Sequence, residues 1–277
     1  MKRTIIWILS LVMMITFVTP AFALDEGTGE PEQPQTGWVV IDDQTYYIDP
    51  DTEEPVIGVT KVDGTYYCFD LNGVLTAGWM EIEGFKWYAD ENGVVQTGLK
   101  KIDGAKYLFD KAVYYYTLDS GEDICLYGVM NDVGIYKRYV ISYTGKLYKM
   151  PSKKKDKKCK KIAKIIAKCS GKKCKDMKDL EKVSRAAITV GEFYGRCEYS
   201  MTAKYYNKPY GVFYAKKCSC AGTTRAMGLV LHYMGFKWTH VNENKYKHQW
   251  CKLKMDGKKG WADGMIGMAG YGKHPAQ

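Results

Sequence analysis

Residues 78–98 read GWMEIEGFKWYADENGVVQTG, and this stretch decides the fold of the front half of the chain. Two short runs rich in apolar and aromatic residues flank the turn dipeptide Glu83-Gly84, and a second turn dipeptide, Asn92-Gly93, follows. Short strands joined by a two-residue turn with glycine in the second position are typical of β-hairpins. The stretch therefore predicts a strand, a tight turn, a second strand and another turn.

This unit recurs with a period near twenty over residues 36–110. Glycines mark the period, and an aromatic pair follows in most units. The glycines are Gly37, Gly58, Gly78 and Gly98, and the aromatic pairs are Tyr46-Tyr47, Tyr66-Tyr67 and Trp87-Tyr88. One hairpin is too small to be stable alone, but stacked hairpins bury shared aromatic side chains. We predict a β-hairpin solenoid of ~20-residue repeats over residues 36–150, degenerate after residue 110.

The repeats resemble the cell-wall-binding repeats of Gram-positive surface proteins, of the choline- and glucan-binding type. The matching motifs are Thr36-Gly37-Trp38, Ala77-Gly78-Trp79, Lys86-Trp87-Tyr88 and Asp90-Glu91-Asn92-Gly93. The resemblance implies binding of a cell-wall polysaccharide or teichoic acid, for which the candidate residues are Trp38, Tyr47, Tyr67, Trp79, Trp87 and Tyr88. Val59 and Leu99 stand where the choline pattern has a cage tryptophan. A stacked spacer whose aromatic residues all lie in the core is the alternative.

The first 35 residues have the composition of an export signal and a linker. Lys2 and Arg3 precede a mostly apolar run over residues 5–18, and Ala21-Phe22-Ala23 is a small-x-small cleavage pattern. The run is shorter than the ~20 residues that span a bilayer. We predict a signal peptide over residues 1–23, a flexible linker over 24–35, and a secreted protein without a transmembrane anchor after cleavage.

The charge distribution divides the chain into modules. Residues 24–150 carry 22 acidic and ten basic residues, whereas residues 151–182 carry 14 lysines and four acidic residues. The apolar fraction of 46% excludes wholesale disorder. We predict a Lys-rich connector over residues 151–177, with an amphipathic helix over about 156–169. A solvated helix packed on the next domain is favoured over contact with anionic polymers, and nucleic acid is not expected as a partner of an exported protein.

A nucleophile motif opens the back half of the chain. Residues 221–234 have the composition and apolar spacing of a helix, which Gly235 ends. Cys220 therefore stands at a helix N-terminus, where the unsatisfied N–H groups and the helix dipole favour a thiolate. The thiolate is the reactive form of cysteine in nucleophilic catalysis.

The second part of the motif is a hairpin around the turn Asp256-Gly257. If Met255 pairs with Lys258, the register places His248 and Asp263 on one face of the sheet, within reach of each other. A base oriented by a carboxylate and brought near a helix-capping cysteine forms a Cys-His-Asp triad.

These residues resemble the transglutaminase-like (papain-related) superfamily. The matching elements are Cys220-Ala221-Gly222, Gly235, His248-Gln249-Trp250 and Asp263. The resemblance implies an α+β papain-like domain over residues 178–277. In it Cys220 would attack an amide carbonyl, His248 would carry the proton, and Asp263 would orient His248. The sequence departs from the family at Thr223, Cys251 and Gly264, which leaves the substrate pocket undefined.

The combined prediction is a multidomain, wall-associated cysteine enzyme, a peptidase, amidase or acyltransferase. Its substrate would be the amide bonds of a peptide or protein, with hydrolysis favoured over cross-linking because water is always available. No cofactor and no metal is expected, since Cys218-x-Cys220 with His248 has poor zinc spacing. The alternative is a non-catalytic wall-binding protein with a degenerate domain. The odd count of nine cysteines leaves at least one thiol unpaired or bonded to another molecule. A disulfide from Cys220 to Cys218 or Cys251 would indicate the non-catalytic protein.

Overall fold

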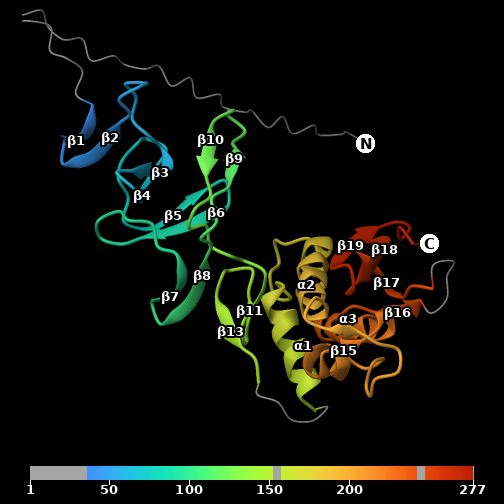
Figure 1. The fold of residues 1–277 in the computed structure, drawn as a ribbon. Coiled ribbons are helices and arrows are strands. Elements are labelled where there is room, and N and C mark those ends of the chain that lie inside the picture. Colours follow the sequence, from blue (N-terminus) through green and yellow to red (C-terminus); the bar gives the residue numbers. More distant parts are fainter. Residues whose placement is uncertain (1–35, 152–156, 242–246, 277) are drawn as a thin grey trace, which may run out of the picture. The chain divides into compact units, whose positions relative to one another are not determined.

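A computed structural model describes residues 36–151, 157–241 and 247–276, and shows hairpins followed by a helical part with its own sheet (Figure 1). The predicted signal peptide and linker lie outside the described residues. No helix of the described chain is both long and apolar enough to cross a membrane.

Four antiparallel hairpins follow one another at the predicted period. They are β1 (Gly37–Ile41) with β2 (Gln44–Ile48), β3 (Gly58–Val62) with β4 (Thr65–Phe69), β5 (Gly78–Ile82) with β6 (Phe85–Ala89), and β7 (Gly98–Ile102) with β8 (Ala105–Phe109). The two residues of each turn have positive φ, as in Asp63 at 48° and Gly64 at 84°. This geometry suits the right-handed twist of the strands and explains the acidic-residue–glycine dipeptides. The predicted repeat of β-hairpins is confirmed.

Loop segments tie one hairpin to the next. The Asp70 and Asp90 carboxylates each accept two backbone N–H groups within their own loops and so fix the second turn of the unit. The following residues then bond to an earlier hairpin, with Cys68 N–H donating to Gly93 O at 3.0 Å and Val95 N–H donating to Tyr66 O at 2.9 Å. The array is thus a stack of two-stranded sheets joined by loop hydrogen bonds.

The segment after residue 110 changes character. It forms the hairpin β9 (Tyr115–Thr117) with β10 (Asp123–Cys125), and then the three-stranded sheet β11 (Gly134–Tyr136), β12 (Tyr139–Ile141) and β13 (Leu147–Lys149). Ile124 and Cys125 pack into the core of the hairpin array. Ile135 and Val140 instead belong to the core of the helical part. The segment therefore contributes to both cores.

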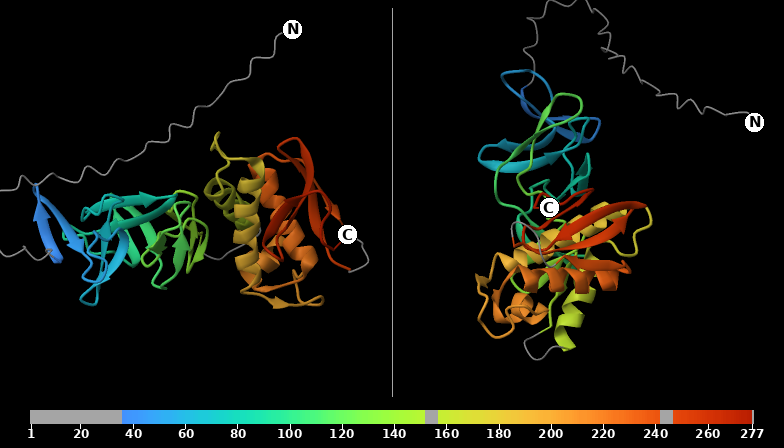
Figure 2. Two further views of the ribbon diagram at one scale, coloured as in Figure 1. Left: turned by 90° about the horizontal axis from the view of Figure 1, so that it is seen from above. Right: turned by 90° about the vertical axis from the view of Figure 1, so that its right-hand side faces the viewer.

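The helical part contains three helices and a four-stranded sheet. Its elements are α1 (Lys157–Cys169), α2 (Asp179–Tyr194), α3 (Cys220–Met234), and the sheet β16 (Trp238–Val241), β17 (Trp250–Met255), β18 (Lys258–Asp263) and β19 (Met268–Tyr271). Between α2 and α3 lie β14 (Glu198–Tyr199), the π-helix η1 (Gly211–Ala215) and β15 (Lys217–Cys218). Helices α2 and α3 contact the sheet, and α1 packs on α3 (Figure 2).

The predicted amphipathic helix is present as α1, and residue 156 at its predicted start lies outside the described residues. Ile162, Ala163 and Ile166 are buried in the core shared with α2 and α3, whereas most of its lysines point away from that core. This is the pattern of a surface helix with one apolar stripe. The favoured interpretation of a helix packed on the following domain agrees with this arrangement.

We expect Ile166→Ala to lower the free energy of unfolding of the full chain by about 2–5 kcal/mol, because it opens a cavity in a fully buried site. The neighbouring Ile165 is only partly buried, so Ile165→Ala should cost less. Urea denaturation followed by circular dichroism measures both. An equal or larger loss at position 165 would contradict the burial of this helix face.

Candidate active site

Cys220 is the first residue of α3 and is 8% exposed. Ser219 before it is extended at φ −118°, so the helix starts at the cysteine. The first turn of α3 packs closely against the preceding loop, because a Cβ atom on Gly222 would lie 2.4 Å from the backbone oxygen of Tyr206. The backbone N–H of Ala221 also donates to the sulfur and favours its anion.

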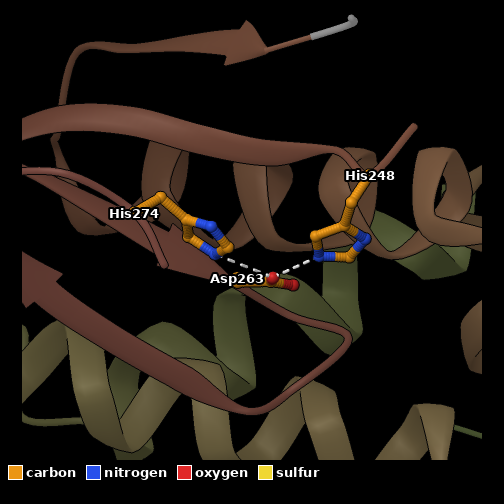
Figure 3. Close-up of side chains that lie close together, drawn as sticks. All are labelled: His248, Asp263 and His274. Atoms are coloured by element: carbon orange, nitrogen blue, oxygen red, sulfur yellow. Dashed lines mark hydrogen bonds and ion pairs between the residues drawn. The ribbon is translucent and has the colours of Figure 1, made fainter. Parts of the chain in front are cut away.

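The hairpin β17–β18 brings His248 to Asp263. The register runs from Met255↔Lys258 to Cys251↔Ala262, which confirms the predicted pairing, and places Asp263 at the end of β18. His248 Nε2 donates to Asp263 Oδ2 at 2.5 Å, and the carboxylate is 1% exposed (Figure 3). The other oxygen, Oδ1, accepts the backbone N–H of Met265 at 2.8 Å.

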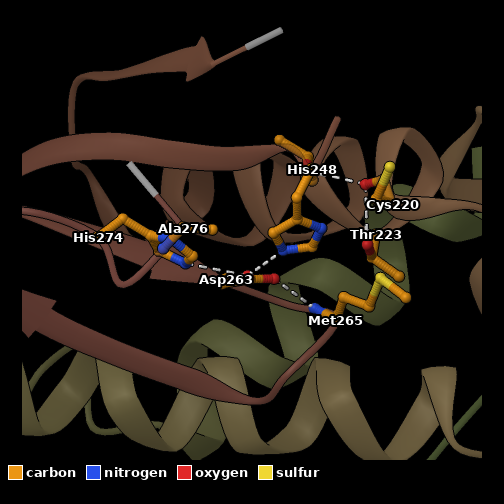
Figure 4. Close-up of polar contacts among 8 residues, drawn as sticks. Cys220, Thr223, His248, Asp263, Met265, His274 and Ala276 are labelled. Carbon is orange, nitrogen blue, oxygen red and sulfur yellow. Dashed lines mark hydrogen bonds and ion pairs between the residues drawn. The ribbon is translucent and has the colours of Figure 1, made fainter. Parts of the chain in front are cut away.

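The imidazole of His248 lies between Asp263 and Cys220 (Figure 4). Hydrogen bonds to Asp263 and then to Cys220 raise the pKa of His248 to about 9, against the effect of burial. The hydrogen bond from His248 likewise lowers the pKa of Cys220 from its ordinary value of 9.0. Both shifts favour a thiolate–imidazolium pair, which exists above the pKa of Cys220 and below about pH 9. The structure thus brings the three residues predicted for catalysis together.

A second histidine, His274, also bonds to Asp263. Its Nε2 donates to Oδ2 at 3.1 Å, while its Nδ1 accepts the N–H of Ala276 at 3.0 Å, which fixes the neutral tautomer. Burial is the main cause that lowers the pKa of His274. Its ring stacks on Trp250 at 4.1 Å between centroids. The only sequence signal is that it is one of four histidines in the chain.

Tyr199 is a second residue that sequence reasoning did not identify. Strand β14 pairs in parallel with β15, which sets Tyr199 opposite Cys218, two residues before the nucleophile. Its hydroxyl forms a hydrogen bond with the sulfur of Cys220 and contributes to the lowered pKa of that thiol. Tyr199 is 49% exposed, whereas Cys220 is 8% exposed.

The thiols near Cys220 have other partners. No disulfide joins any of the nine cysteines, all of which lie in the described part of the chain. Cys218 shares a hydrogen bond with Cys197, which together with burial raises the pKa of Cys218. Cys251 donates to the backbone oxygen of Thr224 at 3.4 Å. Neither thiol is bonded to Cys220 in this arrangement.

The donor set of His248, Asp263 and His274 could also hold a metal ion, since its ligand atoms lie within 4.8 Å of one another. Two ligands of one tetrahedral zinc stand about 3.3 Å apart, as zinc–nitrogen bonds of ~2.0 Å require. The 2.5 Å from His248 to Asp263 is shorter than that. The geometry therefore suits hydrogen bonds better than shared ligation.

The aromatic residues predicted to bind a wall ligand fall on two faces of the hairpins. Trp38 contacts Tyr47 and Tyr67 at 5.3 and 5.0 Å between ring centroids and is 42% exposed. Trp79 contacts Tyr88 and Tyr107 at 5.2 and 4.9 Å and is 40% exposed.

Trp87 is the exception among these predicted residues, because it is 0% exposed and therefore closed to a ligand. Met80 pairs with Trp87, whereas Trp79 pairs with Tyr88, so the two tryptophans point to opposite faces of the hairpin β5–β6. Of the pair Trp87-Tyr88, only Tyr88 shares the exposed face with Trp79.

Comparisons with known proteins give partial similarities. No protein-family model and no curated protein matches the chain. Among solved structures, CbpF in complex with ipratropium is 20% identical with a TM-score of 0.30, and the match covers 42% of this chain and 32% of that one. The choline binding domain of Spr1274 in Streptococcus pneumoniae is 25% identical with a TM-score of 0.24, covering 27% and 89%. A structure described as a TGase is 17% identical with a TM-score of 0.33, covering 45% and 36%.

The matched part of this chain spans about a third of the CbpF structure. The structures found include choline-binding proteins and one described as a TGase. Similarities of this size do not assign the chain to a family.

We expect His248→Gln to move the pH midpoint of Cys220 alkylation upward. The thiolate is the alkylated form, and the hydrogen bond from His248 is the main cause of its lowered pKa. The alkylation rate with iodoacetamide, read at Cys220 by mass spectrometry from pH 5 to 10, gives the midpoint. His232→Gln, on the exposed side of the same helix, should leave the profile unchanged. Identical pH profiles for His248→Gln and the parent would rule out the thiolate–imidazolium pair of Cys220 and His248.

We expect His274→Phe to lower the free energy of unfolding by about 1–3 kcal/mol, because the buried Asp263 loses one donor while the ring stack is kept. His274→Gln, whose amide can donate, should lose less. The exposed His232→Phe serves as the control and should change stability by less than about 0.5 kcal/mol. Thermal and urea unfolding at pH 7 measure all three, and full stability of His274→Phe would show that Asp263 does not need this donor.

Proposed function

We propose that the protein is a secreted, wall-associated cysteine enzyme that acts on amide bonds through Cys220, His248 and Asp263. The observation that carries the proposal is the hydrogen-bonded chain from the buried Asp263 through His248 to the sulfur at the start of α3. A nucleophile, a base and an orienting group in this order are the requirements for acyl transfer.

The chemistry follows from the charge state of the pair. The Cys220 thiolate attacks the carbonyl carbon, and the carbonyl electrons move to oxygen. The start of α3 directs backbone N–H groups toward that developing charge. As the C–N bond breaks, the His248 imidazolium gives its proton to the leaving amine. Water then attacks the thioester carbon as neutral His248 takes a proton from it. The C–S bond breaks, the acid product leaves, and the Cys220 thiolate and His248 imidazolium are restored.

Asp263 keeps His248 in the productive orientation throughout. Its hydrogen bond to Nε2 leaves Nδ1 as the ring nitrogen for Cys220, which fixes the tautomer of the neutral base. An amine that replaced water would give cross-linking in place of hydrolysis. We favour hydrolysis, because water is always available as the acceptor, whereas cross-linking needs an acyl-enzyme that is protected from water.

The hairpin array would hold the enzyme at the cell wall. Trp38 and Trp79 each present a half-exposed indole beside two tyrosines, the kind of surface on which sugar rings stack. The array is strongly acidic, so its affinity for a wall polysaccharide or teichoic acid would come from these aromatic contacts and not from charge. The predicted signal peptide supplies the route of export.

We expect Cys220→Ala to abolish hydrolysis of peptide amides and to reduce by one the number of the nine thiols that react rapidly with a thiol-directed electrophile, with the fold retained. Cys218→Ala, a buried thiol with a different partner, should keep both the hydrolysis and the rapid labelling. Hydrolysis is measured on peptides of the wall and on a casein digest, with new amino groups counted. Equal labelling of Cys220→Ala and the parent would refute the proposed nucleophile.

A metal centre at His248, Asp263 and His274 is the competing function, because their ligand atoms lie within 4.8 Å of one another, even though the separation of His248 and Asp263 suits a hydrogen bond better. It predicts stoichiometric zinc in the purified protein and loss of activity with a chelator. The thiol mechanism predicts that chelation leaves hydrolysis unchanged, so the same assay separates the two.

A further inference from the structure

A cleft of about 670 Å³ lies on the face of the β16–β19 sheet and beneath the C-terminal tail. Its size is that of a typical small-ligand site. Residues of β16, β17 and β18 line it together with the tail; they include five lysines, Lys237, Lys252, Lys254, Lys259 and Lys273, and three tryptophans, Trp238, Trp250 and Trp261. The triad does not account for this cleft.

The lysines come from the alternation of the strands. Cys251, Leu253 and Met255 of β17 are buried in the core with the helices, so Lys252 and Lys254 lie on the opposite face. Lys252 pairs with Trp261 and Lys254 pairs with Lys259 across the hairpin. The positive charges therefore gather on one face by register.

No negative charge balances this face among the residues that the structure describes. None of the residues that line the cleft is Asp or Glu, and no ion pair of the described chain involves any of its five lysines. Five exposed ammonium groups over one cleft raise the local concentration of anions and slow their departure. An anionic ligand would complete the charge pairing.

Aromatic rings contribute to the lining of the cleft. Trp238, Trp250 and Trp261 line it together with the lysines. Aromatic rings offer a ligand flat apolar contact area. A sugar or polyol chain that carries anionic groups can contact both the rings and the ammonium groups, and a small inorganic anion would fill only part of the volume.

His274 lies in the wall between this cleft and the triad. It lines the cleft, stacks on Trp250 and meets Trp261 edge-on at 4.5 Å, and its Nε2 donates to Asp263. A ligand in the cleft would thus sit beside the residue that supports the orienting carboxylate.

We propose that this cleft binds an anionic glycan or polyol polymer through phosphate or carboxylate groups, and so positions the enzyme on its wall substrate. Choosing such a polymer over nucleic acid rests on the export that is part of the proposed function. The binding itself needs no catalysis, so it stands or falls separately from the role of Cys220.

The test measures binding to the full-length Cys220→Ala protein by isothermal titration. The probes are a poly(glycerol phosphate) oligomer, an oligogalacturonate, neutral chitohexaose and single-stranded oligothymidylate, each at 50 and 500 mM NaCl. We expect one or both wall-type anions to bind at low salt and weaken at high salt, which also separates phosphate from carboxylate as the recognised group. Chitohexaose contacts the repeats alone and should be insensitive to salt.

Lys252→Gln with Lys254→Gln should weaken binding of the anions about tenfold, as two charge contacts of ordinary size predict. The control pair Lys172→Gln with Lys173→Gln removes the same charge from exposed positions elsewhere and should bind as the parent. Equal loss in both pairs, or tighter binding of oligothymidylate than of either wall-type anion, would overturn the proposal. When the same two lysine substitutions are made in the protein that retains Cys220, labelling of Cys220 should match the parent, which shows that the proposed active centre is intact.

Discussion

The architecture of the candidate site depends on one buried carboxylate. Asp263 is 1% exposed, and burial of a carboxylate is tolerated only when hydrogen bonds replace water. Its donors are His248, His274 and the backbone of Met265. They come from the segment before β17, from the C-terminal tail and from the turn after β18. One acid therefore holds three separate segments in place and sets the orientation of the imidazole that faces the sulfur.

The departures from the transglutaminase-like pattern have structural explanations. A Cβ atom on Gly264 would lie 2.6 Å from Val190 and 3.2 Å from Met227, so glycine lets the chain after Asp263 pass close to α2 and α3. Cys251 is buried under the sheet and bonds to the backbone of α3. Thr223 donates to the carbonyl of Cys220 at 2.8 Å and steadies the first turn of the helix. Each departure supports the packing of the site and leaves its three polar groups unchanged.

The two halves of the chain differ in charge and in the side chains that they expose. The acidic hairpin array presents half-exposed indoles, whereas the helical part gathers lysines on one sheet face beside the candidate site. A polymer that carries sugar rings and negative charges could meet aromatic contacts on the first and ammonium groups on the second. Two weak contacts on one chain give a higher overall affinity than either alone when both can be made together.

The sequence by itself determined the local structure. The acidic-residue–glycine dipeptides fix the hairpin turns, Gly235 ends α3, and the turn Asp256-Gly257 sets the register that pairs β17 with β18. These features are encoded by neighbouring residues, because turn geometry and helix caps involve only a few positions.

Only the tertiary structure decided which distant groups meet. Trp87 is buried and Trp79 exposed because the array covers one face of their hairpin, which the repeat pattern does not specify. His274 and Tyr199 reach the site from the tail and from β14, and neither has a spacing that relates it to Cys220. The lysine cleft likewise joins strands and tail. Such contacts depend on how elements pack, and packing is a property of the whole fold that short-range periodicity does not carry.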